Sequence, residues 1–125
     1  MKKAIDVGLV GAGRIGRVHA ENLAYRIAEA NLVAVSDVFV EAAEKLAAEL
    51  QIPALYKDHR AILDDASVDA VLICSSTDTH AQLIEEAAEA GKQIFCEKPI
   101  AHDLAEIDQA LAAADRAGVK LMIGF

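Results

Sequence analysis

Three closely spaced glycines near the N-terminus could bind a phosphate group. Gly11, Gly13 and Gly16 form the pattern G-x-G-x-x-G directly after an apolar run that ends at Val10. In a strand–turn–helix unit, the first glycine makes the tight turn, the second lets the backbone approach a pyrophosphate, and the third lets helix and strand pack closely. The phosphates would lie on free backbone N–H groups at the positive end of a helix dipole. The segment therefore predicts a pyrophosphate-binding turn.

An acid at the end of the next apolar run adds a second part to this pattern. The run Leu32–Ser36 ends at Asp37, about 20 residues beyond Gly16, where a dinucleotide-binding unit needs a carboxylate for the adenosine ribose hydroxyls. A carboxylate repels a 2′-phosphate, and the following Val38 and Phe39 bring no positive charge. The pattern predicts a nucleotide site that takes NAD rather than NADP. The alternative is that the glycines are ordinary turn residues and Asp37 an ordinary strand end.

A polar segment follows another apolar run. Ser75, Ser76 and Thr77 offer hydroxyl and backbone N–H groups toward a cofactor. The structural alternative is a helix N-cap, with Thr77 or Asp78 satisfying free N–H groups. His80 fits equally well as a packing residue near the cap or as a contact on the nicotinamide side.

Lys98 is the strongest candidate for chemistry. It lies at the end of the run Gln93–Glu97, where its ammonium could hydrogen-bond a substrate hydroxyl and stabilise developing oxyanion character. The same contact would hold a reacting carbon near the cofactor ring. Pro99 restricts the backbone after it and is a residue type that tolerates a cis bond. From the residues alone, the alternative is a solvated surface lysine.

The elements that must position these residues alternate along the chain. This alternation predicts right-handed βαβ units and a doubly wound parallel sheet, a three-layer αβα Rossmann fold with strand order 3-2-1-4-5-6. Its ligands would bind at the carboxyl ends of the strands. We expect strands at 5–10, 32–36, 54–56, 70–75, 93–97 and 120–124, and helices at 14–30, 41–50, 60–64, 79–90 and 104–117.

Composition narrows the class of protein. The chain has 125 residues, enough for one domain, and is 54% hydrophobic but only 4% aromatic, so Ala, Val, Ile and Leu must build its core. That composition suits a parallel sheet covered by helices. A formal net charge of −8 disfavours binding to nucleic acid or to anionic membrane surfaces. We find no signal-peptide pattern and no apolar run long enough to span a bilayer, so a cytoplasmic location is expected.

The cysteines and histidines give no metal-ligand spacing. Cys74 and Cys96 fall near the ends of strand-like runs and are expected to be buried free thiols, close together if their strands are neighbours. A cytosolic setting argues against a disulfide, and two isolated cysteines do not make a zinc site. The histidines are scattered in the sequence, at positions 19, 59, 80 and 102. We therefore expect no metal site.

Taken together, the motifs resemble those of the Gfo/Idh/MocA oxidoreductases, most of all their inositol 2-dehydrogenase branch. The resemblance covers the entire chain and rests on Val10–His19, Cys74–His80 and Phe95–Ile100. It implies that the pyrophosphate is held by Gly11, Gly13, Arg14, Ile15 and Gly16, and the ribose by Asp37. It also implies that Glu97 and the loop 75–77 line the nicotinamide half, and that Lys98 orients a substrate hydroxyl during hydride transfer to NAD. The complete glycine pattern and Glu-Lys-Pro speak against a methyltransferase that binds S-adenosylmethionine.

The resemblance also implies what the chain lacks. Family members continue into a second domain that supplies most substrate contacts and a catalytic histidine, which none of the four histidines here matches. We therefore expect residues 1–125 to form an NAD-binding domain that binds NAD(H) with little turnover, its polyol or sugar substrate requiring the full-length protein. Surface left uncovered predicts a homodimer, formed by simple association or by segment exchange. The alternative is an engineered or reconstructed, non-catalytic and self-associating scaffold.

Overall fold

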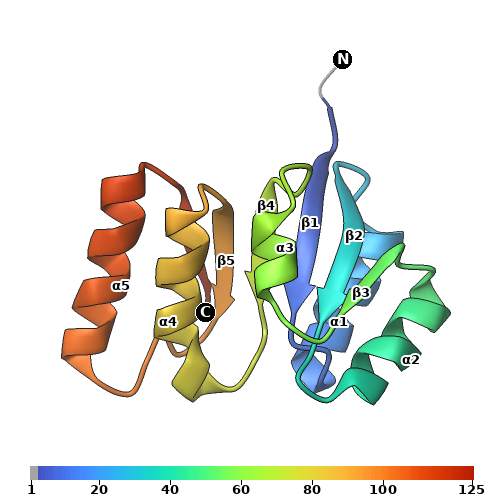
Figure 1. The fold of residues 1–125 in the computed structure, drawn as a ribbon, viewed down its shortest axis with the longest axis horizontal. Helices are drawn as coiled ribbons and strands as arrows, with labels where there is room; N and C mark the ends of the chain where they lie inside the picture. Colours follow the sequence, from blue (N-terminus) through green and yellow to red (C-terminus); the bar gives the residue numbers. More distant parts are fainter. Residues whose placement is uncertain (1–2) are drawn as a thin grey trace.

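The fold is a six-stranded parallel sheet with order β3-β2-β1-β4-β5-β6, as the sequence predicts. A computed structural model describes residues 3–125. Strands and helices alternate along the chain (Figure 1). The strands are β1 (Ile5–Val10), β2 (Ala30–Ser36), β3 (Ala54–Tyr56), β4 (Ala70–Ile73), β5 (Gln93–Glu97) and β6 (Leu121–Gly124). The helices are α1 (Arg14–Tyr25), α2 (Val40–Leu50), α3 (Arg60–Asp64), α4 (Thr77–Glu89) and α5 (Leu104–Ala117).

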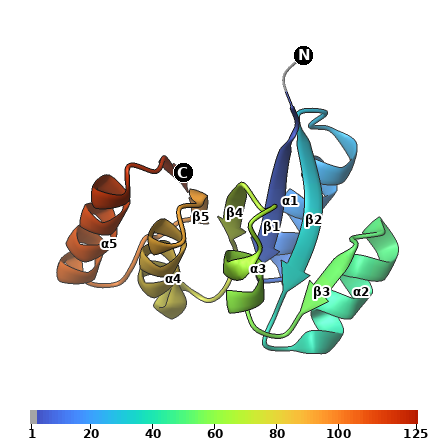
Figure 2. The same ribbon diagram turned by 45° about the horizontal axis from the view of Figure 1, so that its top comes forward.

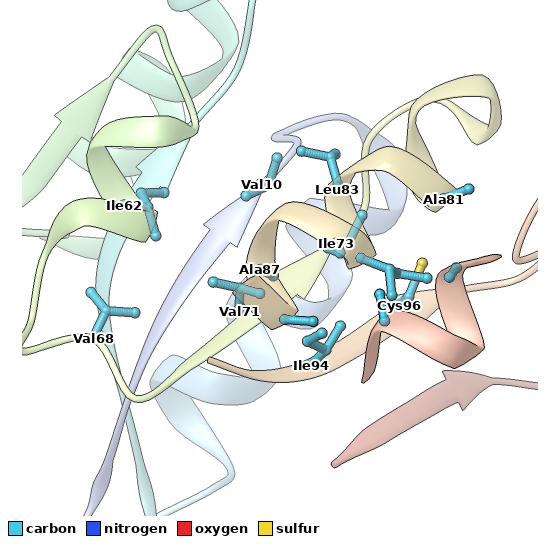
Figure 3. Close-up of a cluster of buried hydrophobic side chains, with 14 of the residues drawn as sticks. Val10, Ile62, Val68, Val71, Ile73, Ala81, Leu83, Ala87, Ile94 and Cys96 are labelled. Carbon is cyan, nitrogen blue, oxygen red and sulfur yellow. The ribbon is translucent and has the colours of Figure 1, made fainter. Parts of the chain in front are cut away.

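The helices divide between the two faces of the sheet. One buried cluster joins α3, α4 and α5 to the sheet, and Figure 3 shows its centre, with Ile73 of β4 and Ile94 of β5 facing Leu83 and Ala87 of α4. A second cluster joins α1 and α2 to the opposite face, around Leu9. Figure 2 separates the two layers, with α4 and α5 on one side and α1 behind β1. Small side chains on the helices let them lie close to a sheet that is buried on both faces.

The second face is only partly covered. Helices α1 and α2 pack over β1, β2 and β3. Beside α1, over β4, β5 and β6, lies a groove of about 400 Å³ with a mainly apolar lining that includes Leu23, Leu72, Phe95 and Met122. Met122 is 65% exposed, a high fraction for a strand methionine. The sheet therefore has three layers around β1–β3 and an open apolar face toward β6.

Helix α1 ends at Tyr25, five residues before the predicted end. β2 begins already at Ala30, because Ile5 of β1 pairs with Ala30 and the chain needs the residues between for the turn. The N–H of Arg26, which follows the last helical residue, bonds the carbonyl of Asn22. Apolar residues in 26–30 continue the helical pattern of the sequence, but the pairing of Ala30 with Ile5 requires the helix to end earlier. The other differences are small: β4 ends at Ile73, and α4 begins two residues early.

The first turn of α4 is not capped as the sequence suggested. Ser76 occupies the N-cap position and makes no side-chain capping bond, so the prediction that Thr77 or Asp78 caps the helix is wrong. Instead the Thr79 hydroxyl donates to the Ser76 carbonyl at 2.7 Å and shares a 2.7 Å bond with the Ser75 hydroxyl. The helix α5 differs, because Asp103 accepts from the Ala105 N–H at 2.7 Å. The N-terminus of α4 therefore keeps free N–H groups.

Both cysteines are buried free thiols, as predicted. Their strands are neighbours, since Ile73 pairs with Cys96, but the thiols belong to different clusters on opposite faces of the sheet. Burial, followed by the nearby Glu97 charge, raises the pKa of each thiol to about 12. Both groups are therefore protonated and weakly nucleophilic at neutral pH. Across residues 3–125, no helix combines the length and apolar character needed to cross a membrane.

Candidate dinucleotide-binding site

One cavity lies where a doubly wound sheet binds its ligands. It has a volume of about 520 Å³ and opens at the carboxyl ends of β1, β2 and β4, on either side of the point where the strand order reverses. The segments that follow β1, β2, β3 and β4, together with one face of α4, form its walls. Of the predicted residues, the cavity is lined by Gly11, Gly13, Asp37, Ser75 and Ser76.

Glycine occupies each of the three positions in the turn for a different structural reason. Gly11 has φ +101°, and a Cβ there would lie 2.5 Å from the backbone carbonyl carbon of Cys74. A Cβ on Gly16 would overlap the Gly11 carbonyl oxygen. Gly13 has an extended backbone, and a Cβ there would meet no atom within 4 Å. The protein itself therefore requires glycine at 11 and 16, whereas Gly13 only keeps space open above the turn, which fits the approach of a pyrophosphate.

The acid after β2 is fixed by two backbone bonds. Asp37 Oδ2 accepts from the Ala12 N–H at 2.8 Å, and Oδ1 accepts from the Phe39 N–H at 2.9 Å. Each carboxylate oxygen keeps a further lone pair, so a ribose diol has acceptors available. Beside it, the Ser36 hydroxyl is buried, lines the cavity and has no hydrogen-bond partner among residues 3–125. The donors and acceptors present thus fit a nucleoside ribose and pyrophosphate.

Two helix N-termini meet at this edge of the sheet. Neither α1, which begins after Gly13, nor α4, which begins after Ser76, has a side-chain cap. Free N–H groups and the positive end of each helix dipole therefore face the region above the strands. Arg14 and Ile15 lie exposed on the first turn of α1 and do not line the cavity.

Among the cavity residues that the sequence missed, three are ionisable and lie far from the glycine turn along the chain. Lys57 follows β3, and the Asp37 N–H bonds the Tyr56 carbonyl at 3.3 Å, which brings Lys57 to the same wall. His59 and Glu86 also line the cavity and pair with each other at 2.8 Å. No residue near Asp37 in sequence is basic, so only the pairing of β2 with β3 reveals the nearby positive charge.

Glu97 and Lys98 lie outside the cavity lining. The Glu97 carboxylate points to the α1 side, where Oε1 is 2.7 Å from His19 Nε2. Lys98 is exposed and its backbone N–H donates to Glu97 Oε2 at 3.2 Å. The Lys98–Pro99 peptide bond is cis. His19, which the sequence left without a role, thus belongs to the surroundings of Lys98.

His80 is buried between two loops. Its Nδ1 is 2.7 Å from the Pro99 carbonyl oxygen and its Nε2 is 2.9 Å from the Ser75 carbonyl oxygen. Only 2% of its surface is exposed. Of the two interpretations left open, the structure favours packing, because both ring nitrogens already face protein acceptors. Thr77, at the start of α4, is half-buried and does not line the cavity.

These features define a dinucleotide-binding Rossmann domain, with the glycine turn, the ribose acid and two open helix N-termini at one edge of the sheet. A comparison with protein families matches residues 5–125 to the oxidoreductase family with an NAD-binding Rossmann fold, Gfo/Idh/MocA. The chain belongs to this family. The predicted family, fold and NAD-binding character are thereby confirmed.

Named relatives act on inositol. The chain is 49% identical over 121 residues to an inositol 2-dehydrogenase of Rhizobium meliloti, and 43% identical over 119 residues to the myo-inositol 2-dehydrogenase of Thermotoga maritima. These alignments cover 97% and 95% of this chain but 36% and 35% of the relatives. The structure of a Lactobacillus casei scyllo-inositol dehydrogenase with bound NAD(H) and scyllo-inositol matches with a TM-score of 0.93 at 35% identity. That match covers 98% of this chain and 36% of the other, so the chain spans about a third of these relatives.

Proposed function

We propose that this chain is the cofactor-binding part of a dehydrogenase that oxidises a secondary alcohol of a cyclic polyol or sugar. The support is the site itself together with the inositol dehydrogenases among its relatives. Bound NAD supplies the hydride acceptor. The chain's own residues bind and orient: the glycine turn takes the pyrophosphate and Asp37 the adenosine ribose. Because Asp37 repels a 2′-phosphate, NAD is preferred over NADP.

The observation that carries this proposal is the open space at Gly13. A residue with an extended backbone, at which a Cβ would meet no atom within 4 Å, has no packing reason to be glycine. A ligand that must approach the backbone closely supplies the reason. The position therefore separates ligand binding from folding, which the other two glycines of the turn cannot do.

The test is a titration of the purified chain with NADH, monitored by calorimetry and by nucleotide fluorescence. The same titration with NADPH is the comparison. We expect saturable binding of NADH in preference to NADPH. Gly13→Ala should reduce NADH affinity by about tenfold or more while changing the melting temperature little. Alanine restricts the unfolded chain, but it is a poorer N-cap than glycine, and Gly13 is the N-cap of α1. Wild-type affinity in folded Gly13→Ala would argue against the pyrophosphate assignment.

We further propose that Lys98 contacts the substrate hydroxyl, and that Ser75, Ser76, Thr77 and Glu97 lie around the nicotinamide half, with His80 packed behind them. Of these, Ser75 and Ser76 reach the cavity directly, whereas His80 and Glu97 act on the surroundings of Lys98. Lys98 alone lacks a proton acceptor for the alcohol, so the chain by itself should turn over very slowly. Measurable turnover by the purified 125-residue chain, with an inositol and NAD, would contradict this.

The same assay addresses the alternative of a non-catalytic scaffold. A scaffold that has lost its ligand site would give neither NADH binding nor an effect of Gly13→Ala. A cofactor domain gives both without turnover. We favour the cofactor domain because its site retains each element that the cofactor requires, from the open Gly13 position to the Asp37 acceptors.

We also propose that the chain forms a homodimer through the apolar groove beside α1. Exposed apolar surface of this kind promotes association in water, and Met122 and Phe95 would be covered. Light scattering over a wide concentration range tests this, with Met122→Glu as the variant expected to shift the chain toward monomer. A monomer at all concentrations would overturn it.

Two unpaired cysteines suit a reducing, cytoplasmic setting.

A further inference from the structure

Two histidines from different helices hold the tripeptide that contains Lys98. His19 of α1 bonds the Glu97 carboxylate, and His80 of α4 bonds the Pro99 carbonyl, each at 2.7 Å. Lys98 lies between these two attachment points. We propose that His19 and His80 are positioning residues that fix the direction in which Lys98 leaves the end of β5. The functional importance of this positioning rests on the proposed role of Lys98. The two histidine contacts, and their effect on the order of the Lys98 backbone, do not depend on that role.

Strand pairing does not fix Lys98. The pairing of β5 with β4 ends at Cys96, and its pairing with β6 ends at Glu97 opposite Gly124. Lys98 is exposed, so packing does not hold its side chain either. The path of the backbone at Lys98 therefore depends on what holds its neighbours. These are the side-chain bonds at Glu97 and Pro99, together with the core packing of Ile100 and Ala101 that follow.

The His19 contact reaches the Lys98 backbone through Glu97. One Glu97 oxygen is bonded to the His19 ring, and the other accepts the Lys98 N–H at 3.2 Å. The His19 ring also packs edge-on against Phe95, with ring centroids 5.3 Å apart and planes at 63°. Both partners of the His19–Glu97 pair are partly buried, which limits competition from water. The His19 ring, the Glu97 carboxylate and the Lys98 N–H are thus joined by consecutive hydrogen bonds.

The His80 contact ties Lys98 to the other loop of the site. Its ring joins the Pro99 carbonyl at 2.7 Å to the Ser75 carbonyl at 2.9 Å, so the segments after β4 and β5 are linked through one side chain. Carbonyl oxygens only accept, and a neutral imidazole has a single N–H, so a neutral His80 donates to only one of the two carbonyls. We assign that proton to Nδ1, which makes the shorter contact, to Pro99. At 2% exposure, water cannot replace a lost bond.

The experiment measures solvent exchange of the Lys98 amide by NMR in the whole chain. His80→Asn places an amide nitrogen where Nδ1 lies and keeps the Pro99 bond, whereas His80→Gln places it where Nε2 lies and keeps only the Ser75 contact. We expect exchange about fivefold to tenfold faster in His80→Gln, as for one lost hydrogen bond, and near wild type in His80→Asn. Amides of the central strand β1 should not change in either variant.

The His19 contact has its own pair of variants and a matched control. His19→Gln keeps an N–H donor for Glu97 and should retain slow exchange at Lys98, whereas His19→Phe should accelerate it to a similar extent as His80→Gln. His59→Phe is the control, because His59 and Glu86 form a pair of similar length and burial away from Lys98. It should leave the Lys98 amide unchanged.

The outcomes separate this proposal from the proposed function. Equal exchange in His80→Asn and His80→Gln, or in His19→Gln and His19→Phe, would overturn positioning and leave only a general contribution to stability. Acceleration spread evenly over the sheet would overturn it as well. If a His80 variant does not fold, the His19 pair decides. NADH titration of the wild type is independent: its failure rejects the proposed function, whereas a selective response of the Lys98 amide still supports the two histidine contacts.

Discussion

The Asp37 carboxylate accepts a hydrogen bond from the backbone N–H of Ala12, with nitrogen and oxygen 2.8 Å apart. The residues lie on different loops, and the bond joins the acid after β2 to the glycine turn after β1. A second bond, from the Phe39 N–H, fixes the other carboxylate oxygen. The glycine turn and Asp37 are therefore held as one unit. In the proposed roles as pyrophosphate turn and ribose acceptor, this preorganisation would lower the entropy lost when a nucleotide binds.

A substitution that tests the charge of Asp37 should keep its bond to the Ala12 N–H. Asp37→Asn keeps an oxygen acceptor for the Ala12 N–H but removes the charge, and its amide group replaces the oxygen that accepts from the Phe39 N–H. The bond to the glycine turn is therefore kept while repulsion of a 2′-phosphate disappears. With Lys57 on the same cavity wall, we expect the ratio of NADPH to NADH affinity to rise by roughly tenfold or more. Fluorescence titration with both nucleotides measures the ratio.

Two comparisons sharpen the Asp37 test. Asp37→Ala also loses the bond from the Ala12 N–H in the turn, so it should bind both nucleotides more weakly than Asp37→Asn does. Glu44→Gln removes an exposed acid of α2 and should leave the ratio unchanged. If Asp37→Asn likewise leaves it unchanged, the carboxylate does not select the cofactor.

Gly16→Ala should damage the fold rather than only the site. Its Cβ would overlap the Gly11 carbonyl oxygen, a backbone atom that cannot move without shifting the turn. Overpacking of this kind costs about 1–3 kcal/mol of unfolding free energy. Urea denaturation measures the loss, and Gly13→Ala, with open space at the same turn, is the matched comparison that should lose much less. Equal stability of the two variants would contradict the packing argument.

The sequence predicts features that depend on residues close together along the chain better than features that depend on residues far apart. The glycine turn, Asp37 and the strand order follow from local periodicity and spacing, and all of them were predicted correctly as structure. The end of α1 was not, because the register of β2 against β1 cut the helix short. The His19–Glu97 bond spans 78 positions along the chain. Such a partner can be identified only when the packing of α1 against the sheet is known.

A buried lysine far from the site provides a test of the fold. Lys92 is 6% exposed, and its ammonium donates to the Asp65 and Val68 carbonyls, each at 2.7 Å. Lys92→Met fills the space but removes both bonds. The Asp65 carbonyl still accepts from the Val68 N–H at 3.1 Å, whereas the Val68 carbonyl loses the Lys92 ammonium, so we expect a loss of about 1–3 kcal/mol in unfolding free energy. Urea denaturation measures it. Lys45→Met, at an exposed position of α2, should change stability by less than about 0.5 kcal/mol.

The two thiols predict how stability depends on pH. Burial raises the pKa of Cys74 and Cys96 from 9.0 to about 12, so above pH 9 the unfolded chain loses thiol protons that the folded chain keeps. Their contribution to stability is complete below pH 9 and is lost as the pH rises from 9 toward 12. Denaturation at a series of pH values should show this decline. In a Cys74→Ala, Cys96→Ala variant the decline should be shallower, and an identical slope would argue against the thiols as its source.

Lys98→Met should separate cofactor binding from chemistry. Lys98 is exposed, lies outside the cavity lining and is held through its backbone, so its ammonium is free to meet a substrate rather than the nucleotide. Because an exposed charge contributes little to binding, NADH affinity should stay within about threefold of wild type. Calorimetric titration of both chains gives the comparison, and Lys57→Met is the contrast, because Lys57 lines the cavity itself. A loss for Lys98→Met as large as that for Gly13→Ala would place the Lys98 ammonium on the cofactor and remove the ground for assigning it to the substrate hydroxyl.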